Sequence, residues 1–149
     1  RPHIARVLMN KGYVQSAKEA FDRFLAQGKP AYVPRELPDP VEAMAWIRAA
    51  KGVPVLAHPL WAKQNGEGLF ALCGRLKTEG LGGMEVHYST HNPKQTAELL
   101  DIAKRLDLLV TGGSDFHGLT KPDIEVGVGR GGLTVPATLL EPLKHAASA

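Results

Sequence analysis

Three short apolar runs, separated from one another by segments with helical periodicity, constrain the fold of this 149-residue chain more than any other feature. Apolar runs of this length are typical of buried strands. Regular alternation of helix and strand is typical of a parallel sheet with crossover helices. The sequence therefore predicts an α/β fold from residue 39 onward. The predicted strands are residues 53–57, 84–88 and 108–110, with a short fourth strand at 126–129, and the predicted helices are 40–51, 67–78, a segment that begins at Asn92–Pro93, and 136–147.

The first quarter of the chain carries a different pattern. Apolar residues at helical spacing predict two short helices, the second of which begins with a Ser16–Glu19 capping box. Segment 29–38 contains three prolines and is typical of an extended linker. We therefore expect two parts, a small helical unit over residues 1–38 and an α/β unit over residues 39–149.

Composition excludes several classes of protein. Hydrophobic residues make up 44% and charged residues 22%, as in ordinary globular proteins. A single cysteine, Cys73, rules out a disulfide within the chain and fits a reducing cytoplasm. The net charge of +3, without a run of lysines or arginines, is too small to indicate nucleic-acid binding by itself. No apolar stretch approaches the ~20 residues that span a membrane, so we expect no membrane partner.

Histidines and an aspartate follow the predicted strands. His58 comes directly after the first strand, His91 follows the second, and Asp115 and His117 follow the third. The carboxyl ends of parallel strands meet at one edge of the sheet, where α/β folds bind ligands. A carboxylate with two or three imidazoles suits Zn²⁺, Mn²⁺ or Fe²⁺. The sequence therefore predicts a divalent metal site at this edge.

Simpler interpretations remain open for each of these residues taken alone. An extended backbone would place the side chains of Asp115 and His117 on the same face, but a loop with a helix cap and a surface histidine explains the segment equally well. His58 would equally serve as a hydrogen-bond partner of a loop carbonyl. The convergence of all of them at one sheet edge favours the metal site.

The motifs around these residues resemble the later motifs of the PHP (polymerase and histidinol phosphatase) superfamily. The motifs are Ala57-His58-Pro59, Gly83-Met84-Glu85-Val86 and Gly113-Ser114-Asp115-Phe116-His117-Gly118. Residues 1–8 and 28–34 resemble its metal-dependent phosphoesterase branch, which includes nucleoside 3′,5′-bisphosphate and nucleoside monophosphate phosphatases and an RNA 5′-exonuclease. The resemblance implies the second half of a distorted (β/α)7 barrel, with residues 1–38 as the end of a helical insertion. The missing N-terminal half of the barrel would be its partner.

The resemblance also implies roles for individual residues. Divalent ions, two or three in the complete barrel and drawn from Mn, Zn, Fe or Mg, would activate a water for attack on phosphorus. Asp115 and His91 would take part in catalysis. One departure is visible, because many members follow His-Pro closely with Gly-Arg, whereas residues 59–61 here are Pro-Leu-Trp. The residues that match metal-ligand positions are His58, Asp115 and His117, and those that match substrate-binding positions are Arg1, His3 and His91.

We therefore expect a cytoplasmic hydrolase that cleaves phosphomonoesters of small nucleotides or of RNA 5′ ends, with this chain alone inactive for want of the N-terminal ligands. The alternative is a non-catalytic PHP-like module that binds a partner protein or a DNA polymerase subunit, but such a module needs neither Asp115 nor the histidines. An amidohydrolase-like metal hydrolase is a third interpretation. It requires a bridging lysine, and no lysine stands out at a predicted strand end.

Overall fold

The computed structural model describes residues 2–34 and 36–148. The chain divides into two compact units, residues 1–37 and residues 38–149. Each unit has a hydrophobic core of its own. No helix among the described residues is long and apolar enough to cross a membrane.

The first unit is helical, as predicted. Helix α1 (Pro2–Asn10) is followed by α2 (Ala17–Ala20), which continues directly into a π-helical turn, η1 (Phe21–Leu25). The hydroxyl of Ser16 accepts a hydrogen bond from the Glu19 N–H at 3.1 Å, which caps α2 as the capping-box pattern indicates. The small core that holds these helices together consists of Ala5, Val14, Ala20 and Leu25. That this unit belongs to an insertion stays a prediction.

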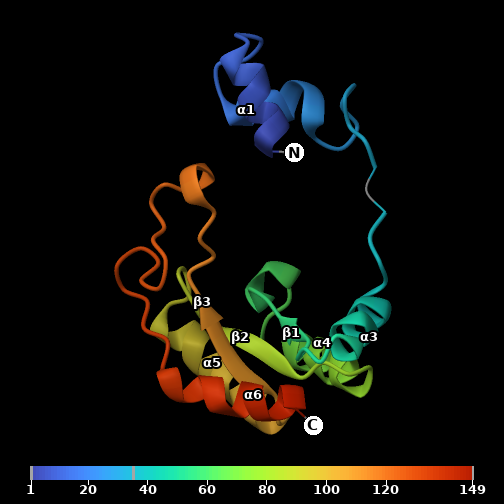
Figure 1. The fold of residues 1–149 in the computed structure, drawn as a ribbon, viewed down its shortest axis with the longest axis vertical. Coiled ribbons are helices and arrows are strands. Elements are labelled where there is room, and N and C mark those ends of the chain that lie inside the picture. The colour runs from blue at the N-terminus through green and yellow to red at the C-terminus, as the bar shows by residue number, and fades with distance from the viewer. Residues whose placement is uncertain (1, 35, 149) are drawn as a thin grey trace. The chain divides into compact units, whose positions relative to one another are not determined.

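The second unit is built on a three-stranded parallel sheet in the order β1-β2-β3 (Figure 1). The strands are β1 (Val55–Leu56), β2 (Gly83–Tyr88) and β3 (Leu109–Gly113). Helix α4 (Gly66–Thr78) connects β1 to β2, and α5 (Pro93–Arg105) connects β2 to β3. The parallel sheet with crossover helices is therefore confirmed, and all three carboxyl ends lie at one edge.

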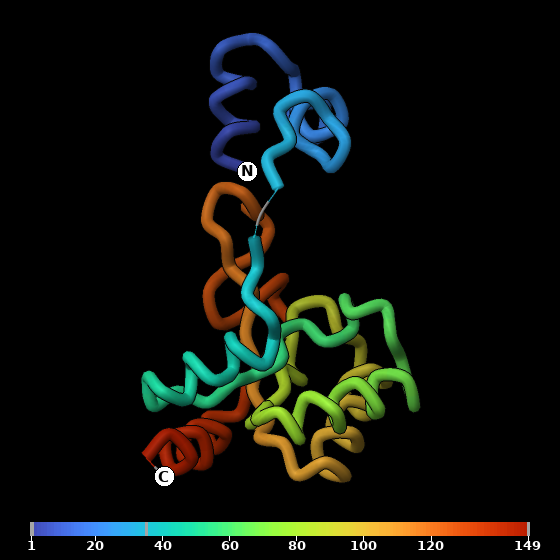
Figure 2. The backbone as a smooth tube through the Cα atoms, turned by 90° about the vertical axis from the view of Figure 1, so that its right-hand side faces the viewer, coloured from blue at the N-terminus to red at the C-terminus, as the bar shows by residue number. Residues whose placement is uncertain are grey.

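The core of the second unit lies between the sheet and its crossover helices, which run side by side on one side of it (Figure 2). Helix α3 (Pro40–Ala49), capped by Asp39 as predicted, adds Met44 to this core. Burial of one leucine contributes about 1.5–3 kcal/mol, so a cluster of this size accounts for much of the unit's stability. Core residues with no more than 2% of their surface exposed include Leu69, Cys73, Met84, Val86, Leu99 and Ile102.

Cys73 is a structural thiol within this core. Its Sγ lies 3.9 Å from the sulfur of Met84, and burial raises the pKa of the thiol. A buried thiol with a raised pKa holds little thiolate, so Cys73 is chemically inert.

The predicted fourth strand is wrong. Residues 126–129 form a turn closed by an isolated antiparallel bridge between Glu125 and Gly129. Gly127 and Gly129 have φ of 82° and 60°, left-handed values that a strand does not allow. The final helix is confirmed as α6 (Leu140–Ser148), preceded by a 3₁₀ turn, η4 (Ala137–Leu139).

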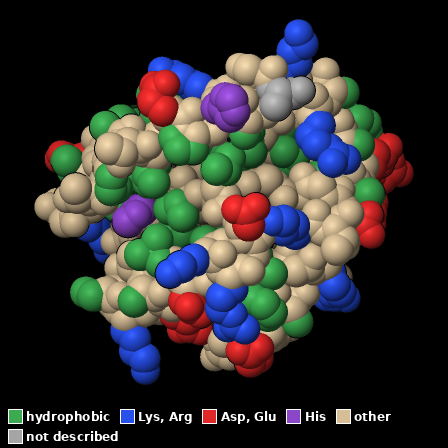
Figure 3. Space-filling view, turned by 90° about the horizontal axis from the view of Figure 1, so that it is seen from below, with side chains coloured by type: hydrophobic (Ala, Val, Ile, Leu, Met, Phe, Trp, Pro, Cys, Tyr) green, Lys and Arg blue, Asp and Glu red, His purple; other side chains and the backbone are tan. Residues whose placement is uncertain are grey.

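The surface carries charges of both signs. On the face shown in Figure 3, lysines and arginines are interspersed with aspartates and glutamates rather than gathered into a basic patch. This distribution agrees with the small net charge.

Candidate active site

The turns after β1 and β3 both begin with a residue in left-handed backbone conformation. His58 has φ of 33° and ψ of 59°, and Asp115 has φ of 57°. This region costs a residue other than glycine roughly 1–3 kcal/mol, and such residues persist where surrounding contacts hold them. The two turns therefore need support from outside themselves.

That support comes from the central strand, β2. The carboxylate of Glu85 accepts the His58 N–H at 2.7 Å, across 27 residues of chain. The Ser89 hydroxyl, just after β2, donates to the Ser114 carbonyl at 2.7 Å, and the Tyr88 hydroxyl donates to Asp115 Oδ2 at 2.9 Å. Side chains of one strand thus fix the turns of both its neighbours.

Asp115 lies at the centre of a cluster of charged and polar groups. Besides Tyr88, its Oδ2 accepts a hydrogen bond from Lys121 Nζ, and its Oδ1 lies 3.5 Å from His117 Nδ1. The side chain is 17% exposed, and this burial raises the pKa of its carboxyl. The hydrogen bonds from Lys121 and Tyr88 and the charges of Lys121 and His117 outweigh burial, so the pKa lies below its ordinary value.

The pKa of the Tyr88 hydroxyl is shifted in the opposite direction, upward. Burial, followed by the hydrogen bond to Asp115, raises the pKa of its hydroxyl to about 12. Tyr88 therefore stays protonated at neutral pH and serves as a hydrogen-bond donor to the carboxylate.

His117 is oriented by the backbone of Asp115. The backbone there is not extended, but the two residues still meet, because Nδ1 of His117 lies 2.7 Å from the Asp115 carbonyl oxygen. A carbonyl only accepts, so Nδ1 carries the hydrogen, and in the neutral ring Nε2 then carries the lone pair. A ring fixed in this way through Nδ1 is typical of histidines that bind a metal through Nε2.

His58 lies beside this cluster and is packed among aromatic rings. Its ring centroid is 4.6 Å from that of Trp61 and 6.1 Å from that of Tyr88. Within residues 2–34 and 36–148, no three His, Cys, Asp or Glu side chains form an arrangement that would hold a metal ion. The structure therefore brings Asp115 and His117 together and places His58 against Tyr88, their neighbour, short of a three-donor cluster.

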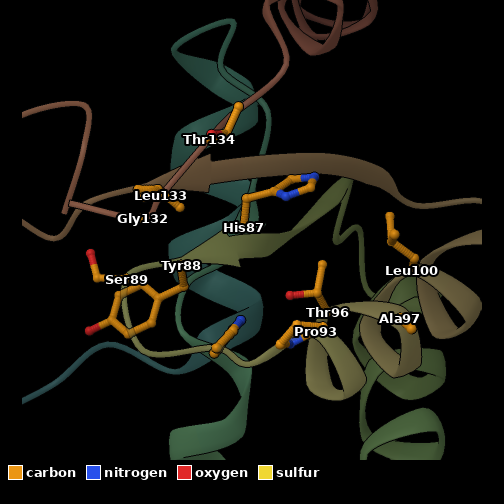
Figure 4. Close-up of a pocket in the computed structure, with 11 residues that line it drawn as sticks. His87, Tyr88, Ser89, Pro93, Thr96, Ala97, Leu100, Gly132, Leu133 and Thr134 are labelled. Carbon is orange, nitrogen blue, oxygen red and sulfur yellow. The ribbon is translucent and has the colours of Figure 1, made fainter. Parts of the chain in front are cut away.

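His91 faces different surroundings. Its Nδ1 lies 2.8 Å from the Val86 carbonyl oxygen, so Nδ1 donates, while Nε2 is buried without a hydrogen-bond partner among the described residues. The ring helps to line a pocket of about 530 Å³ between the end of β2, the start of α5 and residues 132–134 (Figure 4). In the neutral tautomer Nε2 is an acceptor, so a hydrogen bond to a phosphate oxygen requires the protonated imidazolium.

The two remaining predicted residues lie in the first unit. His3 is an exposed residue of the first turn of α1. Arg1 lies outside the described residues. Their substrate-binding role stays a prediction.

Sequence reasoning missed four residues of the cluster: Trp61, Glu85, Tyr88 and Lys121. Tyr88 is the last residue of a predicted strand, which was a usable signal, whereas Glu85 lies near the start of that strand and gave none. Lys121 gave none, because it reaches Asp115 only through the 3₁₀ turn η3 (Gly118–Thr120).

Curated proteins similar to this chain are named as an exoribonuclease and as a nucleoside bisphosphate phosphatase. The chain is 38% identical over 117 residues to a 5′-3′ exoribonuclease of Haemophilus influenzae, covering 78% of this chain and 43% of that protein. It is 31% identical over 127 residues to a 3′,5′-nucleoside bisphosphate phosphatase of Chromobacterium violaceum, covering 85% and 45%. The chain thus spans less than half the length of these curated relatives. No protein-family profile matches it.

Two solved structures also resemble this chain. A Bifidobacterium adolescentis protein described as a metal-dependent phosphoesterase superposes with a TM-score of 0.72 at 33% identity, over 97% of this chain and 49% of that one. A Chromobacterium violaceum protein described as an amidohydrolase with bound sulfate superposes with a TM-score of 0.69 at 27% identity, over 97% and 50%. The similarities support the resemblance to PHP-type phosphoesterases.

Proposed function

We propose that this chain is part of a metal-dependent phosphoesterase that hydrolyses phosphomonoesters of small nucleotides or of RNA 5′ ends. The observation that carries the proposal is the cluster at the carboxyl ends of the sheet, where the Asp115 carboxylate meets Tyr88, His117 and Lys121. The relatives that act on a nucleoside bisphosphate or on RNA support the substrate class.

The donor set fits one side of a metal site. Asp115 offers a carboxylate that its neighbours keep ionised, and His117 offers Nε2 with Nδ1 already bonded to a carbonyl. His58 is the third ligand in this proposal, and further ligands would come from the other half of the barrel. The divalent ions, Mn, Zn, Fe or Mg, supply Lewis acidity and lower the pKa of a bound water.

The other residues of the cluster would position the ligand Asp115 and stabilise charge on the substrate phosphate. Tyr88 holds the rotamer of Asp115 through its hydrogen bond. The ammonium of Lys121, already at the site, would stabilise negative charge on phosphoryl oxygens. His91, once protonated, would donate to the phosphate or the leaving oxygen, while substrate binding by Arg1 and His3 stays a prediction.

Substitution of the central carboxylate tests the proposal in the whole protein that contains this chain. Asp115→Asn keeps the shape but removes the charge, and we expect metal content and phosphate release from a nucleoside 3′,5′-bisphosphate to fall together. Asp101→Asn is the matched control, because Asp101 is an exposed α5 aspartate paired with Arg105 at 3.4 Å, and it should change neither quantity.

Two results would contradict the proposal. Full metal content and turnover in Asp115→Asn would remove the ligand role. A wild-type protein that binds a protein partner but hydrolyses neither the bisphosphate nor a 5′-phosphorylated RNA would favour the non-catalytic interaction module.

A further inference from the structure

Trp61 is a large apolar side chain left 60% exposed beside the Asp115 cluster. Its indole lies against the His58 ring at 4.6 Å between centroids, and the centroid of the Tyr88 ring lies 6.3 Å away with the two rings nearly perpendicular. These contacts hold the ring on the buried side. The rest of the indole is open to solvent at the edge of the sheet where the site lies.

The turn that carries Trp61 is held by a backbone hydrogen bond and a buried proline. Trp61 belongs to the 3₁₀ turn η2 (Pro59–Ala62), and its N–H donates to the His58 carbonyl at 2.9 Å. Pro59, which starts the turn, is fully buried, and its ring fixes φ. A ligand that covered the indole would therefore meet a preorganised surface and would lose little to ordering it.

A cation lies next to this aromatic surface. Lys121 Nζ is 5.7 Å from the centroid of the Trp61 ring and at the same time pairs with Asp115. An exposed indole, an ammonium and a carboxylate are thus gathered within one small area. Aromatic rings stack on any nucleobase because every base has a π face, whereas an ammonium binds phosphate oxygens.

We propose that Trp61 is the stacking surface for the nucleobase of the substrate, and that Lys121 contacts the phosphate carried by the same nucleoside. The inference rests on the proposed function and deepens it, since it assigns base recognition to one residue. The chemistry recognised is a nucleobase joined through its sugar to a phosphate. A free nucleotide and the 5′-terminal nucleotide of an RNA both supply it.

Paired ligands separate base recognition from phosphate recognition. Dissociation constants of the whole protein would be measured by calorimetry for a nucleoside 3′,5′-bisphosphate and for ribose 5-phosphate, which lacks the base. Trp61→Ala should weaken binding of the bisphosphate about 5- to 150-fold and leave ribose 5-phosphate within about twofold. Trp61→Phe should restore most of the loss, because a smaller ring still stacks.

Two further variants serve as controls. Trp46→Ala removes the other tryptophan of this chain, which is 57% exposed on α3, and should change neither constant. Lys121→Met should weaken both ligands by a similar factor, since both carry the phosphate. Repeating the Trp61→Ala comparison with a 5′-phosphorylated triribonucleotide distinguishes the sources, because the larger loss identifies the better ligand.

Each contrary outcome has its own meaning. If Trp61→Ala weakens both ligands equally, or neither, base stacking on Trp61 is wrong while the proposed function stands. If the wild-type protein neither binds nor hydrolyses any of these phosphomonoesters, the proposed function falls and the inference with it.

Discussion

Glu85 is the residue whose substitution most directly tests how the site is supported. Its carboxylate accepts the His58 N–H at 2.7 Å and is half-buried. A hydrogen bond to a charged group contributes about 1.5–3 kcal/mol, and one between neutral groups about 0.5–1.5 kcal/mol. Glu85→Gln, which can still accept through its amide oxygen, should therefore cost about 1 kcal/mol. Glu85→Ala leaves the N–H unpaired and should cost about 2–3 kcal/mol.

The reasoning predicts more than a loss of stability. The left-handed backbone conformation of His58 costs roughly 1–3 kcal/mol. Without the hydrogen bond to Glu85, we expect the turn to change to a less strained conformation. Substitution of a residue that orients a metal ligand typically lowers metal affinity 10- to 100-fold. We therefore expect Glu85→Ala to weaken metal binding by the whole protein within that range, measured by titration with Mn²⁺ or Zn²⁺.

Glu98 provides the matched control for this experiment. Its carboxylate likewise accepts a backbone N–H, that of Gly66 at 2.8 Å, across 32 residues of chain and at the start of α4. Glu98→Ala should lower the free energy of unfolding by a similar amount, measured by denaturant titration, and leave metal affinity unchanged. If Glu85→Ala and Glu98→Ala reduce metal affinity equally, Glu85 acts only through general stability and the argument is wrong.

Three further predictions concern the same sheet. Gly112→Ala should lower the free energy of unfolding by at least about 1–3 kcal/mol, because a Cβ there would lie 2.6 Å from the Cβ of His87. In the same denaturant titration, Gly132→Ala should change the free energy of unfolding by no more than ~0.5 kcal/mol, because a Cβ at that position meets nothing within 4 Å. Tyr88→Phe should raise the pKa of Asp115 toward its ordinary value, followed by NMR titration of the carboxyl carbon. The pKa of Asp115 is lower in the folded than in the unfolded protein, so the ionised carboxylate stabilises the fold above the unfolded pKa, near 3.8. This stabilisation is lost as the pH falls through the folded pKa. The free energy of unfolding of metal-free Asp115→Asn should therefore fall less steeply on acidification than that of the metal-free wild type.

The parallel sheet and its crossover helices were predictable because the period of the apolar runs and the helix caps are local signals. Asp39 and Asn92 cap their helices as their positions before prolines predict. The failure at residues 126–129 has an equally local cause, since alternating valine and glycine imitate a strand while both glycines adopt left-handed conformation. Gly112 shows the converse: it reads as the end of a strand but continues β3, where its lack of a side chain allows β2 to approach.

The candidate site was predictable only in part. Sequence placed His58, Asp115 and His117 at strand ends, since that needs only strand positions. It did not reveal how these residues are held, because contacts such as Glu85 to His58 and Lys121 to Asp115 depend on left-handed turn conformations that histidine and aspartate adopt far less often than glycine does. Left-handed residues of this kind give no sequence signal comparable to glycine.

The central strand explains why the two flanking turns hold these conformations together. From β2 and the residue after it, Glu85 bonds the turn after β1, while Tyr88 and Ser89 bond the turn after β3. The register shift of β2 between Glu85 and His87 lies between these groups, and beyond it Tyr88 pairs with Gly113. A bulge re-aims the side chains that follow it. The irregularity of β2 therefore lets one strand support the turns on both sides, and restoring regular pairing there would misplace Tyr88 and Ser89 while leaving Glu85 in position.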